Sequence, residues 1–207
     1  MTEKPMLTSK EVLNFWLDEI GPKGWYAGGD DLDQRIRAFA EKTWEKAMDG
    51  SCAFWLTHPS GVLAYSILMD QLPRNMFRGS GNAFSSDIHA RAAVKAAIER
   101  KWDQRIDAPA RQFFFLPLMH SESLTDQERS IRMFMTHMPD TSINGLLHAR
   151  AHREVIRRFG RFPGRNEALG RKMSADEAVF QQNGGYSLIV KDIEAGRCGS
   201  VKIAQVA

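Results

Sequence analysis

Residues 61–72 have the sequence GVLAYSILMDQL. As far as Met69 the apolar residues fall on nearly every face of a helix, without the alternation of a half-buried strand. A helix that is apolar all round lies in the middle of a protein. The stretch therefore predicts a central, buried helix from Ser60 to Leu72. Because proline lacks the main-chain donor, we expect Pro73 to break this helix.

Helical patterns continue on both sides of this stretch. Three pairs have the spacing of capping boxes, which predicts helix starts: Thr8 with Glu11, Thr125 with Glu128, and Ser174 with Glu177. Residues 51–60 fit either a short buried strand or a helical turn. Apolar residues recur at helical spacing over about 9–20, 31–49, 87–102, 109–118, 125–138, 141–159 and 175–182. The pattern predicts an all-α protein.

Domain organisation follows from what interrupts these helices. No low-complexity linker divides the chain, so we expect one all-α domain over residues 1–186. Residues 187–207 form a tail of uncertain structure with β-like residues near its start and two glycine breaks. Oligomeric state is not predictable from these patterns.

Composition is that of an ordinary globular protein, with 207 residues, 43% hydrophobic and 26% charged. Cys52 and Cys198 match no metal or redox spacing, so we expect two free thiols. The N-terminus lacks the pattern of a signal peptide, and no uncharged apolar run is long enough to span a membrane. A cytoplasmic location, with no membrane association, is the expectation.

The basic character of the chain is concentrated in residues 148–171, HARAHREVIRRFGRFPGRNEALGR. Residues 150–172 hold seven arginines and Lys172 against Glu154 and Glu167, a net charge of +6 in a chain whose total is +3. Gly160 suits a helix stop, and Pro163 with Gly164 predicts a tight turn. A local positive field is typical of an anion site, but arginines on a helix also form solvated faces or pair with neighbouring acids.

A second polar cluster follows the central helix. Asp70 and Arg74 are four residues apart and can pair, and Asn75 beside a proline can bond freed main-chain groups. The functional alternative is that Arg74, Asn75 and Arg78 project into a ligand site. Both interpretations remain open from the sequence.

Three histidines are candidates for chemistry. His120 and Glu122 could form an acid–base pair or serve as caps. His148 and His152 share one helix face, but Ala149 stands where the zinc-protease motif needs glutamate, so a polar packing pair is favoured and no metal is expected. No nucleotide-binding loop and no GxSxG motif occurs, so we predict no cofactor.

Three blocks resemble the signature of an uncharacterised bacterial family, domain of unknown function 924. They are LMDQLPRNMFRG (68–79), RQFFFLPLMHSESLTDQERS (111–130) and HREVIRRFGRFPGRNEALGR (152–171). The resemblance implies antiparallel helices stacked in a tetratricopeptide-like superhelix, and no established activity. It also implies that the signature includes Asp70, Arg74, Asn75, Arg78, His120, Glu122, His152, Arg161, Arg165 and Asn166.

These observations support two functional hypotheses. In the first, the protein binds an anionic small molecule or an acidic peptide in a groove lined by Asp70, Arg74, Asn75, Arg78, Arg161, Arg165 and Asn166. In the second, the protein is an enzyme that acts on an anionic substrate in the same groove. His120 or His152 is then the acid–base group, and Glu122 orients it. Nucleic-acid binding is disfavoured, because the total charge is only modestly basic.

Overall fold

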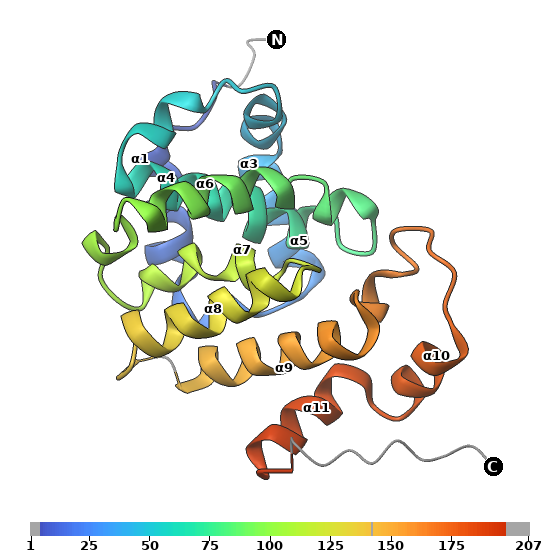
Figure 1. The fold of residues 1–207 in the computed structure, drawn as a ribbon. Helices are drawn as coiled ribbons and strands as arrows, with labels where there is room; N and C mark the ends of the chain where they lie inside the picture. Colours follow the sequence, from blue (N-terminus) through green and yellow to red (C-terminus); the bar gives the residue numbers. More distant parts are fainter. Residues whose placement is uncertain (1–4, 142, 198–207) are drawn as a thin grey trace, which may run out of the picture. The chain divides into compact units, whose positions relative to one another are not determined.

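The chain folds into helices. The computed structural model describes residues 5–141 and 143–197, and within these ranges it contains no β-strand (Figure 1). The predicted all-α fold is confirmed. No helix in the described ranges combines the length and the apolarity needed to cross a membrane.

The helices form two compact units, one up to Leu118 and one from Met119 onward. The first contains α1 (Ser9–Leu13), η1 (Asn14–Ile20), α2 (Gly21–Gly24), α3 (Asp30–Met48), η2 (Ala53–Thr57), α4 (Pro59–Ser66), η3 (Ile67–Gln71), α5 (Leu72–Met76), η4 (Gly81–Phe84), α6 (Asp87–Glu99), η5 (Asp103–Arg105) and η6 (Ala110–Phe114). Helix α7 (Leu116–Met119) follows at the boundary. The second unit contains α8 (Leu124–His137), α9 (Ile143–Phe159), η7 (Pro163–Arg165), α10 (Ala175–Gln182) and α11 (Gly185–Glu194).

The core of the first unit surrounds α4 and η3. Every residue from Gly61 to Leu72 is buried, as the all-round apolar pattern predicts. Helices α1 and α6 pack against α4, and α3 packs against η3 and α5. Burial of each large apolar side chain contributes about 1.5–3 kcal/mol, so this segment adds substantially to the stability of the unit.

The prediction that Pro73 breaks the central helix is wrong. The helical path continues to Met76, because η3 is a wider π-helical turn in which Leu72 N–H bonds to the carbonyl of Ile67. Pro73 then occupies the first turn of α5, where its missing donor is tolerated. The hydroxyl of buried Ser86 donates to the carbonyl of Met69, which is the acceptor that residue 73 would use in a regular α-helix.

Other local predictions also need correction. Residues 109–118 form a 3-10 turn and the start of α7 rather than one helix. At the start of α8, Ser123 is the N-cap and no side-chain cap bond forms, so the capping box at Thr125 is wrong. Of the two alternatives left open for residues 51–60, the helical turn is confirmed, because Ala53–Thr57 form a 3-10 helix.

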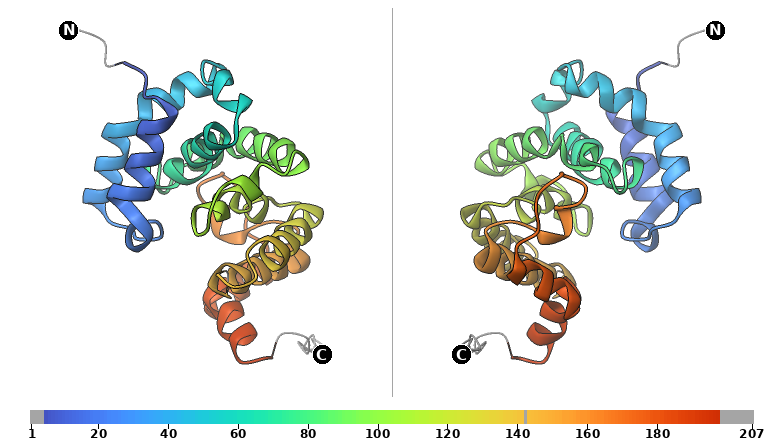
Figure 2. Two further views of the ribbon diagram at one scale, coloured as in Figure 1. Left: turned by 90° about the vertical axis from the view of Figure 1, so that its left-hand side faces the viewer. Right: turned by 90° about the vertical axis from the view of Figure 1, so that its right-hand side faces the viewer.

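The second unit is built on α8 and α9, which pack side by side, with α11 along α9 (Figure 2). Ser174 and Glu177 form the predicted capping box of α10, and Gly160 ends α9 with a positive φ of 67°. The β-like residues after Tyr186 are helical, because they supply the apolar face of α11. The prediction for Cys198 is not tested, since residues 142 and 198–207 lie outside the described ranges.

Candidate functional site

In the first unit, Arg74 lies between two buried carboxylates. Its Nη2 is 3.2 Å from Asp70 Oδ1 and 3.1 Å from Asp87 Oδ1, and its Nη1 donates to the main-chain carbonyl of Asp70. Asp70 is 0% exposed and also accepts a hydrogen bond from Gln71 Nε2. These bonds link α5 to α6 and neutralise the guanidinium within the fold, which is the structural alternative that the sequence left open.

Asn75 and Arg78 both contact Asp33, a residue of α3 that sequence reasoning did not single out. Asn75 Nδ2 donates to Asp33 Oδ1 at 2.8 Å, and Arg78 Nε donates to Oδ2 at 2.6 Å. The hydrogen bond from Arg78 lowers the pKa of Asp33 despite the opposing effect of burial. The sequence gives one weak signal for Asp33, its acidic side chain in the first turn of α3, and this signal does not identify Asn75 and Arg78 as its partners.

In the second unit, Glu122 holds the turn after α9, which comprises residues 160–171. Arg171 Nη1 and Nη2 donate to its carboxylate at 2.8 and 3.0 Å, and the Phe162 N–H donates at 2.8 Å. Burial alone would raise the pKa of Glu122, but these hydrogen bonds outweigh burial and lower it. In the sequence, Arg171 is one of seven arginines of the basic stretch, and no local pattern marks it as the partner of Glu122.

Arg161 and Asn166 both contact Glu177, which is 3% exposed. Arg161 donates to the carboxylate from Nε at 2.5 Å and from Nη2 at 2.7 Å, and Asn166 Nδ2 donates at 3.3 Å. The bonds from Arg161, followed by the N–H of Ser174, lower the pKa of Glu177 to about 2. The capping box predicted the position of Glu177 at the start of α10, but not these partners.

A pocket of about 240 Å³ opens beside the same turn. It combines aromatic rings with one guanidinium, and no carboxylate is among the described residues that line it. The lining consists of His152, Val155, Phe162, Pro163, Gly164, Arg165, Phe180, Gln181 and Tyr186.

His152 has a defined tautomer in this pocket. Its Nδ1 lies 2.8 Å from the carbonyl oxygen of His148, and a carbonyl only accepts, so Nδ1 carries the hydrogen. Tyr186 Oη lies 2.7 Å from His148 Nδ1 and 3.0 Å from His152 Nδ1. Tyr186, which is the last residue of the predicted domain and was not a predicted site residue, thus joins the two histidines, and the Nε2 of His152 keeps its lone pair.

The charge state of His152 follows from its surroundings. Removal from water, together with repulsion from His120 and Arg165, lowers its pKa to about 3. The His120 and His152 ring centroids are 5.9 Å apart, and Arg165 Nη2 donates to the main-chain oxygen of His120 at 2.9 Å. The Arg165 guanidinium also lies over the Phe162 ring, 4.5 Å from its centroid. His152 is therefore a neutral hydrogen-bond acceptor at neutral pH.

Six of the predicted site residues therefore gather around one turn of the second unit. Asp70, Arg74, Asn75 and Arg78 belong to the first unit, and a single groove shared by all ten stays a prediction. Among the described residues, no group of three histidine, cysteine, aspartate or glutamate side chains has the geometry of a metal site.

The fold and this pocket define an all-α protein with a small cationic, aromatic pocket beside a histidine–tyrosine pair. The chain belongs to a bacterial family of proteins of unknown function (DUF924), whose family model matches residues 12–185. This match confirms the resemblance of the three sequence blocks.

A solved structure of a protein of unknown function from Agrobacterium tumefaciens is similar to this chain. The two are 31% identical, with a TM-score of 0.79, over 85% of this chain and 97% of the other. No curated protein matches the chain.

Proposed function

We propose that the pocket formed by Phe162, Arg165 and His152 binds a small anionic molecule. The observation that carries this proposal is the composition of the lining, which places the guanidinium of Arg165 beside aromatic rings and the neutral imidazole of His152. An anion in this pocket gains a charge-assisted hydrogen bond that is about twice as strong as a neutral one.

The remaining lining residues restrict the ligand further. The unprotonated Nε2 of His152 accepts a hydrogen bond from a ligand hydroxyl or amide, while Phe162 and Phe180 supply apolar walls. A volume of about 240 Å³ lies below the usual range of ligand pockets, roughly 300–1,000 Å³. It therefore suits a metabolite with a carboxylate or phosphate group better than an acidic peptide.

The enzyme hypothesis has weaker support. Efficient acid–base catalysis requires a pKa near the working pH, and the pKa of His152 is about 3. The carboxylate of Glu122 accepts hydrogen bonds from Arg171 and Phe162, which hold the turn. A binding role fits these contacts better than proton transfer.

Isothermal titration calorimetry with inorganic phosphate, phosphoenolpyruvate and succinate tests the proposal. At least one of these probes should bind saturably, and Arg165→Gln should weaken its binding roughly 10–100-fold, the loss of one charged hydrogen bond. The matched control is Arg150→Gln, because Arg150 is exposed in the same basic stretch and lies outside the pocket lining. This control should bind like the wild type.

A second variant guards against a purely structural effect of Arg165. Gly164 lines the pocket, and an added Cβ there meets only Gln181 Nε2 at an ordinary 3.5 Å, so Gly164→Leu should fold and obstruct the pocket. Equal binding by the wild type, Arg165→Gln and Gly164→Leu, or no binding of any probe, would contradict the proposal.

A further inference from the structure

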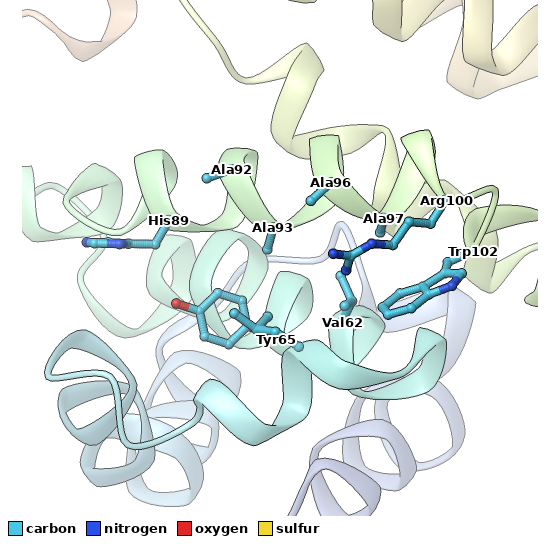
Figure 3. A pocket seen from close by; sticks show the side chains of 10 residues that line it. Val62, Tyr65, His89, Ala92, Ala93, Ala96, Ala97, Arg100 and Trp102 are labelled. Atoms are coloured by element: carbon cyan, nitrogen blue, oxygen red, sulfur yellow. The ribbon is translucent and has the colours of Figure 1, made fainter.

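A larger cavity, of about 450 Å³, lies in the first unit between α4 and α6 (Figure 3). This volume falls in the usual range for small-molecule sites. It plays no part in the function proposed above. It is lined by Leu56, Val62, Tyr65, His89, Ala92, Ala93, Ala96, Ala97, Arg100 and Trp102.

One wall of the cavity is an alanine face of α6. Ala92, Ala93 and Ala96 lie on neighbouring turns and present only methyl groups, while Ala90 and Val94 are buried in the core. Small side chains allow a planar ring to approach the helix closely. The face by itself specifies no ligand, and two of the polar groups that line the cavity, besides His89, supply that information.

Tyr65 is the first of these groups. It is 7% exposed, and its hydroxyl has no hydrogen-bond partner among the residues that the structure describes. The side chain is mostly enclosed, but its hydroxyl oxygen is not fully buried, so a molecule that enters the cavity can bond to it. Figure 3 shows the hydroxyl directed toward the end of the cavity where His89 lies. Burial raises the pKa of Tyr65, so the hydroxyl keeps its hydrogen.

Arg100 is the second group, at the opposite end. Its guanidinium lies over the Trp102 ring, 5.0 Å from the centroid, and extends back above Val62 (Figure 3). Within the described part of the chain it forms no ion pair, and no described lining residue is a carboxylate. The cation is exposed, lies against the aromatic ring and is available to an anion.

We propose that this cavity binds an aromatic carboxylic acid with a hydroxyl group on the far side of its ring. The ring lies on Ala92, Ala93 and Ala96, the carboxylate pairs with Arg100, and the ring hydroxyl bonds to Tyr65. Along α6, Ala92 and Arg100 are about 12 Å apart, which accommodates a ring and a carboxylate. The site is separate from the pocket at Arg165, and each proposal stands or fails alone.

Calorimetric titration of the full chain with 4-hydroxyphenylacetate tests this assignment. One-to-one saturable binding is expected. Phenylacetate lacks the hydroxyl and 4-hydroxyphenethyl alcohol lacks the carboxylate, so each should bind about tenfold more weakly. Equal affinity for all three compounds, or no binding of any, would overturn the assignment.

Variants locate the binding. Arg100→Gln should weaken 4-hydroxyphenylacetate about tenfold and leave 4-hydroxyphenethyl alcohol unchanged, whereas Tyr65→Phe should abolish the preference for the hydroxyl. Arg105→Gln is the matched control, because Arg105 is exposed nearby but does not line the cavity. Tyr65→Phe removes an unbonded hydroxyl, so its Tm should equal that of the wild type.

Two outcomes would assign the ligand elsewhere. Ala96→Leu enlarges an exposed alanine of the wall and should exclude the ligand from the cavity. If Ala96→Leu binds like the wild type, or if Arg165→Gln rather than Arg100→Gln abolishes binding, the cavity at Arg100 is not the site.

Discussion

Glu177 shows how one buried carboxylate organises several residues. It caps α10 by accepting a hydrogen bond from the Ser174 N–H at 2.7 Å, and it also accepts hydrogen bonds from Arg161 and Asn166. Removing one partner of a buried, hydrogen-bonded charge pair leaves the other without compensation. Arg161 therefore acts first as part of the fold of the second unit.

Glu177→Gln should lower the Tm at pH 7, because it keeps the side-chain shape and removes the charge. The pKa of Glu177 falls from 4.5 to about 2 on folding, so its stabilisation is complete above about pH 5 and is lost as the pH drops toward 2. Thermal unfolding from pH 7 to pH 2 should show the difference between wild type and variant shrinking toward zero.

The matched control for this prediction is Glu167→Gln, an exposed carboxylate of the same turn. It should unfold at the wild-type temperature throughout the pH series. A Glu177→Gln variant whose deficit is the same at pH 2 and pH 7 would show that its charge contributes nothing.

At the scale of an element, η3 and α5 depend on a side chain from outside their own helix. Ser86 is fully buried, donates to the Met69 carbonyl at 2.6 Å, and accepts from Trp44 Nε1 at 3.0 Å. The hydroxyl thus donates to the Met69 carbonyl, to which Pro73 cannot donate because it has no main-chain N–H.

Ser86→Ala should destabilise the protein by about 1–3 kcal/mol, because it removes the buried hydroxyl that donates to the Met69 carbonyl and accepts from the Trp44 N–H. In a Pro73→Ala background the restored main-chain N–H at position 73 can bond to Met69. The same substitution should then cost about 1 kcal/mol less. Urea unfolding of the two single variants and the double variant measures this coupling, and strictly additive effects would contradict the explanation.

For the whole molecule, the tertiary structure changes the meaning of the basic stretch. Its net charge of +6 includes only Glu154 and Glu167 as acids. Three carboxylates from other parts of the second unit pair with it and halve that charge. The pairs are Glu122 with Arg171, Glu128 with Arg153, and Glu177 with Arg161.

The protein should therefore bind nucleic acid no better than a weak non-specific binder. Fluorescence anisotropy with a 20-base-pair duplex at physiological salt should show no saturation up to about 100 µM protein. Tight binding with a steep dependence on salt would contradict this expectation. It would indicate that the basic stretch binds nucleic acid.

The predictable features are those determined over a few residues. Apolar spacing located the central helix and α3, and capping spacing located α1 and α10, because such signals act within one helical turn. Pro73 was mispredicted since its cost depends on a distant hydroxyl at Ser86. The sequence marked His120, Glu122 and Arg165 as candidates, but only the tertiary structure shows that they lie near one turn, because local patterns do not encode contacts across forty residues.

The sequence alone determined that this chain is helical, where several helices begin and end, and which polar residues are candidates for a site. The tertiary structure decided which of them are paired. Arg161, Arg171 and Arg74 look alike in the sequence, but each meets its carboxylates only through packing of separate helices. Helix formation depends on neighbours three or four residues apart, whereas the charge and openness of a pocket depend on long-range contacts.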